Sequence, residues 1–366
     1  MLTSKLKGMG KDFLLQTSAD DQSGKGTCTL FEGGNPIDVV EFPLPENGRQ
    51  AVAILDEQHK ARQERFNRVS ELYDELAQET DVSILLKLAV SLIDQKLYEA
   101  AAKVLGRAAK QAPRNSKVFN ILGLTWIEIE DFEKAGDAFR KALEINPDFP
   151  DYQNNLGRAL LLQGKCHEAA VALERAIALN VYYAEAYYNL AMVLVLNGMK
   201  REDYQLSQNL EERAMAMLAK AAGFNPSFKT QHLQNALESL KEEKHDEAFI
   251  ELARGYDLAA KGKFPKKTYH FHLEYLFRND LLREETVVKH IKNLNRQLEQ
   301  HPNYADLFNE LGLAYTALAQ FHSDRAIEAY QKALQLNPEY KAAMKNLKLI
   351  QNELKGLKTL LKAILK

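Results

Sequence analysis

The sequence predicts an all-α superhelical solenoid of antiparallel helix pairs, with a small β-hairpin element at the N-terminus. Three observations lead to this fold class. Similar segments recur about every 34 residues, apolar residues between them follow a helical period, and β-type alternation of side chains is found before residue 49. A chain of 366 residues is also long for one compact core, which favours an array of repeats.

The composition indicates an ordered chain without a dominant charge. Hydrophobic residues make up 46%, charged residues 27%, and the formal net charge is -2. Because such a chain has no general basic field, a nucleic-acid partner is not expected. Cys28 and Cys166 lack the spacing of a disulfide framework or a zinc site, and no apolar stretch suits a secretion signal or a membrane span. We therefore expect a cytoplasmic protein.

The N-terminal residues, 1–48, differ in pattern from the rest of the chain. The stretches "GTCTLFEGG" and "PIDVVEFPLP" alternate β-branched and aromatic residues around Gly33–Pro36, which predicts a β-hairpin element that packs on the helices or pairs with another edge. Residues 49–81 then predict one long helix, since Leu55, Phe66 and Leu72 fall on a single face. This helix is expected to cap the N-terminal end of the solenoid.

The repeat is clearest where successive helix pairs begin. Three segments align at the repeat spacing: Phe119–Gly123, Gln153–Gly157 and Tyr187–Ala191. Small residues such as Gly123 and Ala135 allow two helices to approach closely, and Phe139 fills the space between them. Pro147 stops the second helix. One such unit cannot bury its apolar face alone, so neighbouring units must stack.

Residues 116–149 match almost fully a pattern of aromatic, Leu-Gly, aromatic, Ala, aromatic, Ala and Pro. On these residues the chain resembles the tetratricopeptide repeat (TPR) family. The resemblance implies a right-handed superhelix of helix pairs whose first helices line a concave groove.

The rest of the chain divides by how well it keeps this pattern. Residues 82–226 predict four TPR-like repeats, the fourth with an insertion near 199–209 that lengthens its inter-helix turn. Residues 227–302 predict degenerate helical repeats, and residues 303–338 predict a further TPR-like repeat with a longer turn. Residues 339–366 predict a basic capping helix.

Projecting the family's groove register onto this sequence gives a set of candidate partner-binding residues. They are Asn120, Leu124, Ile127, Asn155, Arg158, Leu162, Tyr188, Asn189, Met192 and Val195. This surface is unusually apolar for a solvent-facing groove, so it either binds a partner or is covered by the chain itself. For the second alternative, residues 1–48 or the insertion near Asp203–Tyr204 are the candidate covers.

The preferred interpretation is that an amphipathic helix or an extended apolar peptide lies in the groove. Asn155 and Asn189 would bond its backbone, similar to the asparagine ladder of some TPR proteins, and Arg158 would take an acidic group. The family's chaperone-type carboxylate clamp is not expected, because its places hold apolar or acidic residues: Leu86, Val90, Asp151 and Glu185.

No motif for catalysis, a metal or a cofactor emerges from the sequence, so we expect none of the three. His270 and His272 form an HxH pair, but residues two apart on a helix point to different sides. Cys166 beside His167 is a weak candidate for a nucleophile pair. The stretch "KGKFPKKTYHFH" mixes lysines with aromatics, yet a solvated turn between repeats explains it better than a nucleic-acid patch.

The C-terminal helix leaves two interpretations. A lysine stripe lies beside an apolar stripe: Lys345, Lys348, Lys355, Lys358 and Lys362 form the first. A capping helix with a polar outer face is favoured, and a helix that makes weak contact with a membrane surface is the alternative.

The sequence therefore predicts a non-catalytic protein-interaction scaffold or adaptor. The alternatives are a membrane-associated assembly or regulatory factor, and a self-assembling homo-oligomer.

Overall fold

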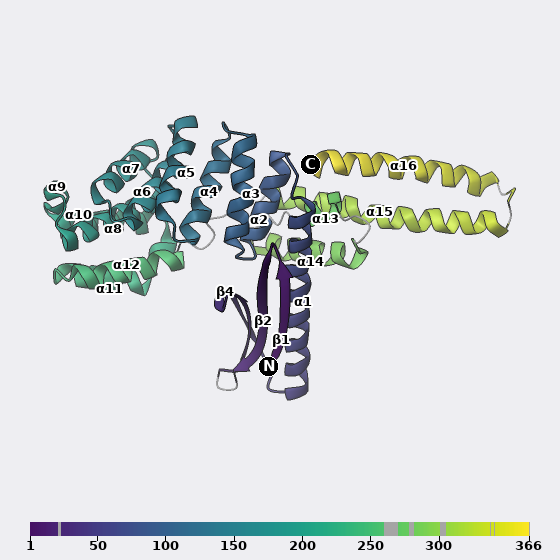
Figure 1. Cartoon of the computed structure of the whole chain (residues 1–366), viewed down its shortest axis with the longest axis horizontal. Coiled ribbons are helices and arrows are strands. Elements are labelled where there is room, and N and C mark those ends of the chain that lie inside the picture. Colours follow the sequence, from purple (N-terminus) through teal and green to yellow (C-terminus); the bar gives the residue numbers. More distant parts are fainter. Residues whose placement is uncertain are drawn as a thin grey trace. The chain divides into compact units, whose positions relative to one another are not determined.

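The computed structural model confirms the predicted fold class, since helices form most of the chain and a small antiparallel sheet precedes them (Figure 1). The structure describes residues 1–20, 23–259, 270–277, 282–300, 305–336, 338–339 and 341–365. The chain divides into two compact units, Met1–Lys267 and Thr268–Lys366.

The N-terminal β element is a four-stranded antiparallel meander rather than a single hairpin. Its strands follow the order β1-β2-β3-β4 and comprise β1 Leu2–Gly8, β2 Lys11–Asp20, β3 Lys25–Glu32 and β4 Asn35–Pro43. The predicted hairpin is β3–β4, where Gly33 and Gly34 have φ values of 57° and 88°. The first hairpin turns at Met9 and Gly10, with φ values of 53° and 76°. Two positive φ angles suit the two-residue turns that join twisted antiparallel strands.

One face of this sheet packs on the long helix α1, Gly48–Glu75, and Figure 1 shows the strands beside it. The Phe13 and Phe66 rings meet edge to face at 4.8 Å between centroids, and Leu15, Leu30 and Val69 are buried. Burial of these apolar side chains stabilises the docking of the sheet. The N-terminal sheet therefore docks through one apolar face of the predicted long helix.

Four helix pairs follow in the first unit. They are α2 Val82–Ile93 with α3 Tyr98–Gln111, α4 Ser116–Glu128 with α5 Phe132–Ile145, α6 Pro150–Leu162 with α7 Cys166–Leu179, and α8 Ala184–Lys200 with α10 Leu210–Phe224. Close approach within pairs needs glycine at two places. A Cβ atom on Gly123 would lie 2.6 Å from the Phe139 ring, and one on Gly157 would lie 2.5 Å from Leu173.

Several helices, among them α2 and α5, begin where a short acidic or amide side chain caps them. The Asp81 carboxylate accepts from the Ser83 N–H at 2.9 Å, and the Asp131 carboxylate accepts from the Lys134 N–H at 3.1 Å. These caps satisfy N–H groups that have no partner within the helix.

The insertion in the fourth pair forms a short helix, α9 Tyr204–Ser207, beside the end of α8. Asn197 organises it, because its side-chain amide donates to the Asp203 carbonyl at 2.8 Å and to the Ser207 hydroxyl at 2.9 Å. Its side-chain oxygen accepts from the Asp203 N–H at 2.9 Å. The lengthened turn is thus an ordered loop closed by one buried asparagine.

A fifth pair completes the first unit but does not continue the stack in register. After a single 3-10 turn, η1 Pro226–Phe228, it consists of α11 Gln231–Lys241 and α12 His245–Ala259. The second helix of this pair, α12, packs against α8, the first helix of the preceding pair. Figure 1 shows α11 and α12 side by side below α8 and α10.

The second unit contains four helices in its described residues: α13 His270–Phe277, α14 Glu284–Gln300, α15 Ala305–Leu336 and α16 Lys341–Leu365. Tyr275, Leu294 and Leu361 belong to its core. The capping helix predicted from the lysine stripe is α16, and it packs along α15.

The helix pair expected over 303–338 is one continuous helix, α15, in the structure. The turns inside the first three helix pairs each hold a residue with positive φ: Lys96 at 62°, Glu130 at 64° and Gly164 at 75°. Within the described span of α15 no residue has a positive φ, and the expected turn is rich in helix formers such as Ala319 and Arg325. The longer turn therefore continues the helix instead of reversing the chain.

Candidate partner-binding groove

The candidate groove is built by the first helices of successive pairs, which lie next to one another: α4 contacts α6, and α6 contacts α8. Asparagine side chains link these helices. The Asn155 amide donates to the Asn120 side-chain oxygen at 2.9 Å, and the Asn189 amide donates to the Asn154 side-chain oxygen at 3.0 Å. The same cross-link thus repeats at equivalent positions of successive repeats.

The structure places the predicted site residues in two different environments. Over α4 and α6, Leu162 is 40% exposed, and three polar residues are half-buried: Asn120, Asn155 and Arg158. Leu124 and Ile127 are buried, each 6% exposed, in a core cluster with Phe139 of α5. Over α8 all four predicted residues are buried: Tyr188, Asn189, Met192 and Val195. We refer to these two parts as the open stretch (α4 and α6) and the covered stretch (α8).

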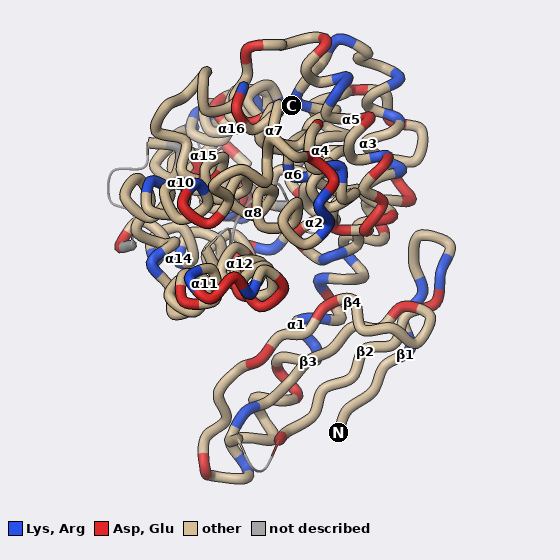
Figure 2. The backbone as a smooth tube through the Cα atoms, turned by 90° about the vertical axis from the view of Figure 1, so that its left-hand side faces the viewer, with Lys and Arg blue, Asp and Glu red and all other residues tan. Residues whose placement is uncertain are grey.

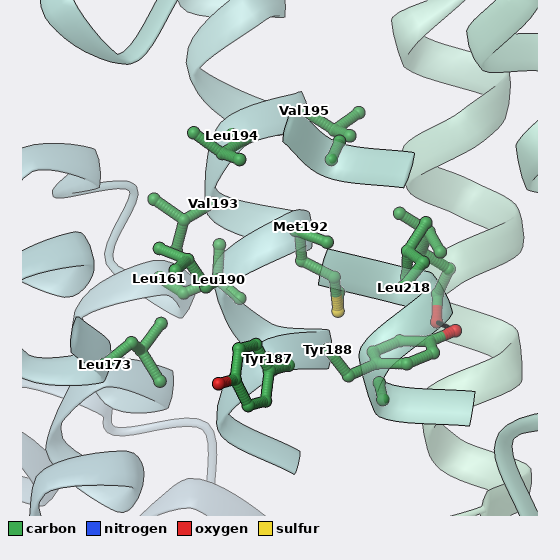
Figure 3. Close-up of a cluster of buried hydrophobic side chains, with 14 of the residues drawn as sticks. Leu161, Leu173, Tyr187, Tyr188, Leu190, Met192, Val193, Leu194, Val195 and Leu218 are labelled. Carbon is green, nitrogen blue, oxygen red and sulfur yellow. Dashed lines mark hydrogen bonds between the residues drawn. The ribbon is translucent and has the colours of Figure 1, made fainter. Parts of the chain in front are cut away.

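The cover over α8 is the chain's own helix α12. The hydroxyl of Tyr188, a residue labelled in Figure 3, donates to the Leu252 carbonyl at 2.9 Å. The Tyr188 ring stacks on Phe228 at 4.6 Å between centroids. Gly255 permits this approach, because a Cβ atom there would lie 2.7 Å from the Tyr188 hydroxyl oxygen. The covered stretch is therefore closed by direct packing and not by a loose segment.

Figure 3 also shows how α8 divides its side chains between two neighbours. Leu190 and Val193 point toward Leu161 of the preceding repeat, whereas Tyr188 and Met192 point to the opposite side. A helix that is apolar on every side must be buried on every side, so α12 supplies the packing that a solvent-facing groove would lack.

Two of the predicted binding residues, Arg158 and Asn189, already contact Tyr256 of α12. The Arg158 guanidinium lies 5.1 Å from the Tyr256 ring centroid, a cation–π contact, and the Asn189 side chain is hydrogen-bonded to the same tyrosine. Burial raises the pKa of Tyr256 to about 12, while Arg158 and the Asn189 hydrogen bond act in the opposite direction. The effect of burial on the pKa is the largest of the three, because the phenol is enclosed on all sides.

The helix α12 is amphipathic. Ala248, Leu252 and Tyr256, spaced four residues apart, form its buried face. The turn before it and its first residues carry four exposed acidic residues: Glu242, Glu243, Asp246 and Glu247. Figure 2 shows red stretches of the tube beside the α11 and α12 labels. The segment that covers α8 is therefore an amphipathic helix of the chain itself.

The covers anticipated from the sequence do not account for this closure. Strands β1 to β4 form the sheet that packs on α1, and the insertion lies at the end of α8. The residues that the sequence reasoning missed are Phe228, Leu252, Gly255 and Tyr256. The apolar period of 248–256 is their available signal, but a period alone does not tell which helix a face will meet.

Other clusters that could carry chemistry have structural partners. His272 Nε2 lies 2.6 Å from a Glu310 carboxylate oxygen, and His167 Nδ1 lies 2.7 Å from an Asp203 carboxylate oxygen. Burial raises the pKa of the Cys166 thiol, which disfavours a thiolate nucleophile. Among the described residues no group of three or more His, Cys, Asp or Glu side chains could hold a metal ion. Most of "KGKFPKKTYHFH" and the His270 side chain lie outside the described residues.

A buried polar chain joins the sheet to α1. His59 Nε2 lies 2.8 Å from the Ser4 hydroxyl, and its Nδ1 lies 2.9 Å from the Thr17 hydroxyl, which donates to the Cys28 sulfur at 3.1 Å. Burial lowers the pKa of His59, so its neutral form is favoured. With both ring nitrogens bonded to hydroxyl groups, this histidine fixes how the sheet docks.

Comparison with known proteins identifies the repeats. Three family models, each described as "Tetratricopeptide repeat", match residues 86–150, 138–172 and 305–340. A peroxisomal targeting signal receptor of Eremothecium gossypii is 34% identical over 136 residues, which is 36% of this chain and 22% of the relative. The receptor of Saccharomyces cerevisiae is 38% identical over 81 residues, covering 22% of this chain and 13% of that protein. The chain thus spans about a fifth or less of these relatives' length.

Solved structures give weaker likenesses. The crystal structure of MamA protein matches with a TM-score of 0.38 and 23% identity, covering 52% of this chain and 99% of that one. YrrB, described as a TPR protein with an unusual peptide-binding site, matches with a TM-score of 0.36 and 19% identity over 53% and 95% of the two chains. Across the described residues, no helix combines the length and apolar character needed to cross a membrane.

Proposed function

The chain is a tetratricopeptide repeat protein, and we propose that it is a non-catalytic interaction scaffold that binds an amphipathic helix or an apolar peptide on the open stretch of its groove. Repeats of this family serve protein interaction, and the matched segments lie on both sides of the degenerate region. The partner would contact Asn120, Asn155, Arg158 and Leu162, with Leu124 and Ile127 as the apolar floor.

One observation carries this proposal: α12 already occupies the covered stretch as an amphipathic helix. It presents apolar residues to α8, keeps its acidic turn outward, and uses Arg158 and Asn189 as polar contacts. The open stretch continues the same row of residues, and Leu162 is 40% exposed there. An exposed apolar side chain beside half-buried amides suits the centre of a protein interface better than open solvent.

The test is site-specific crosslinking with a matched control. A photo-reactive residue is placed at Leu162 in the open stretch, or at Val171 on α7, which is also exposed. After irradiation in a native lysate, the proposal expects a discrete crosslinked protein from position 162 and none from position 171. The purified partner should then lose binding to Leu162→Glu and keep binding to Val171→Glu. Equal crosslinking from both positions, or equal binding by both variants, would contradict the proposed site.

A further inference from the structure

The last helix, α16, carries a long row of positive charge with almost no opposing charge. Its lysines are Lys341, Lys345, Lys348, Lys355, Lys358 and Lys362, and its one acidic residue is Glu353. Lys358 lies 3.9 Å from Asp324 of α15, a weak ion pair. The others are exposed along the helix.

The spacing of these lysines places most of them on one side. Steps of three, four and seven residues connect Lys341, Lys345, Lys348, Lys355 and Lys362, and a helix returns to nearly the same direction after each such step. At 1.5 Å per residue the row extends over about 30 Å. It forms a straight line of charge and not a pocket for one anionic group.

The side of α16 that faces α15 is separate from this row. Ala343, Leu354, Leu361 and Leu365 are buried, and they alternate at helical spacing. The lysine row is therefore free of the packing that holds the helix pair together, and it can meet another surface without disturbing the core.

A second stripe distinguishes α16 from an ordinary capping helix. Leu349, Leu360 and Ile364 are each 52% exposed, and they lie between the lysine row and the buried face. A cap that meets only water would carry polar residues there. Exposed aliphatic side chains near lysines suit an interface between a charged layer and an apolar one.

We propose that the outer face of α16 is a docking surface for an anionic lipid bilayer. Its lysines would meet the charged headgroups, and Leu349, Leu360 and Ile364 would enter the boundary with the acyl chains. A nucleic acid would complement the lysines but leave the leucines in water. The contact is peripheral, and it is independent of the groove proposed above because it uses only residues of α16.

The test is co-sedimentation of the full chain with vesicles of phosphatidylcholine alone or with about a third phosphatidylserine, at low and physiological salt. Binding is expected only to the anionic vesicles and should weaken as salt rises. A basic residue near such a surface contributes about 1 kcal/mol, or roughly 5-fold in affinity. The variant Lys345→Ala/Lys348→Ala/Lys355→Ala should therefore bind on the order of 100-fold more weakly.

Two further variants keep the result interpretable. Replacing three exposed lysines of the first unit, Lys110→Ala/Lys117→Ala/Lys165→Ala, changes the net charge equally and should leave binding intact. Leu360→Gln/Ile364→Gln keeps every lysine and should still weaken binding several-fold, as the leucine contact requires. Absence of binding to anionic vesicles would overturn the proposal. An equal loss of vesicle binding in the two lysine variants would also overturn it. The same holds if the Leu360→Gln/Ile364→Gln variant binds vesicles like the wild type and the chain binds single-stranded RNA equally well.

Discussion

The two stretches of the groove occupy equivalent positions of successive repeats, but they differ in how far their side chains are buried. Over α8 the side chains are apolar on all sides, and α12 encloses Tyr188, Asn189 and Met192. Over α4 and α6 the same row keeps polar amides and one exposed leucine, Leu162. The difference teaches that the apolar excess of this groove has two causes. One part is an internal helix-packing surface, and the other, where Leu162 is exposed, is the part that we propose a partner binds.

The largest loss of stability is expected from a substitution in the covered stretch. Tyr188→Ala removes a fully buried aromatic ring together with its hydrogen bond to Leu252 and its stacking on Phe228. We expect it to lower the free energy of unfolding by roughly 3–5 kcal/mol. In the open stretch, Leu162→Ala should cost less than about 1 kcal/mol, because the side chain is already partly in water. Urea unfolding followed by circular dichroism measures both, and similar losses would remove the distinction between the stretches.

A pH titration should also act on the covered stretch. The pKa of Tyr256 is raised by burial to about 12, above its ordinary value of 10.0, so the folded chain holds this proton more tightly than the unfolded chain. The corresponding stability is present below about pH 10 and is lost as pH rises toward 12. Thermal midpoints should therefore fall between about pH 10 and pH 12, less steeply in Tyr256→Phe than in the wild type. Parallel curves for the two proteins would show that Tyr256 is not enclosed.

The border between the stretches can be measured through one pair of residues. Arg158 belongs to α6, and its guanidinium lies over the ring of Tyr256 in α12. A double-mutant cycle with Arg158→Ala and Tyr256→Leu should give a coupling free energy of about 1 kcal/mol. As a control, Arg175 with Tyr256 should give no coupling, since Arg175 pairs with Asp148 instead. A coupling near zero for Arg158 would mean that α12 does not reach the open stretch.

A further small effect on stability is expected from the asparagine link inside the open stretch. Asn155→Ala removes the hydrogen bond to Asn120, which is only half-buried, so we expect a loss of about 0.5–1.5 kcal/mol. Asn189→Ala, equivalent in position but buried, should cost more, because Asn154 then loses its partner inside the core. Thermal unfolding of the two variants side by side would reveal the order, and the reverse order would contradict the burial difference.

The repeats were predictable because their physical requirements are local. Gly123 and Gly157 are needed for helix contact, and a period in the sequence follows from stacking identical units. The first β-hairpin was missed because Met9 occupies a turn position with positive φ where glycine or asparagine is the usual signal. The continuous helix α15 was missed for the opposite reason. A repeat signature was present, but nothing in the expected turn forces the chain to reverse.

The burial of the predicted groove residues followed from the sequence only in part. The residue types of the groove pointed to a helix as the ligand, and both a partner and a cover from the same chain remained open. Choosing between them required knowing where α12 lies, and its buried face has the same period as any other amphipathic helix. The apolar character of α8 on every side was the one local sign that this part of the groove is closed.

The central claim, that α12 covers α8 and leaves the open stretch to a partner, is tested most directly by hydrogen exchange. Mass spectrometry would compare the wild type with Leu252→Glu/Tyr256→Glu, whose charges should expel α12 from the groove. Faster exchange confined to α8, α11 and α12, with α4 and α6 unchanged, is the predicted result. Unchanged exchange in α8, or equal acceleration through α4 and α6, would contradict it.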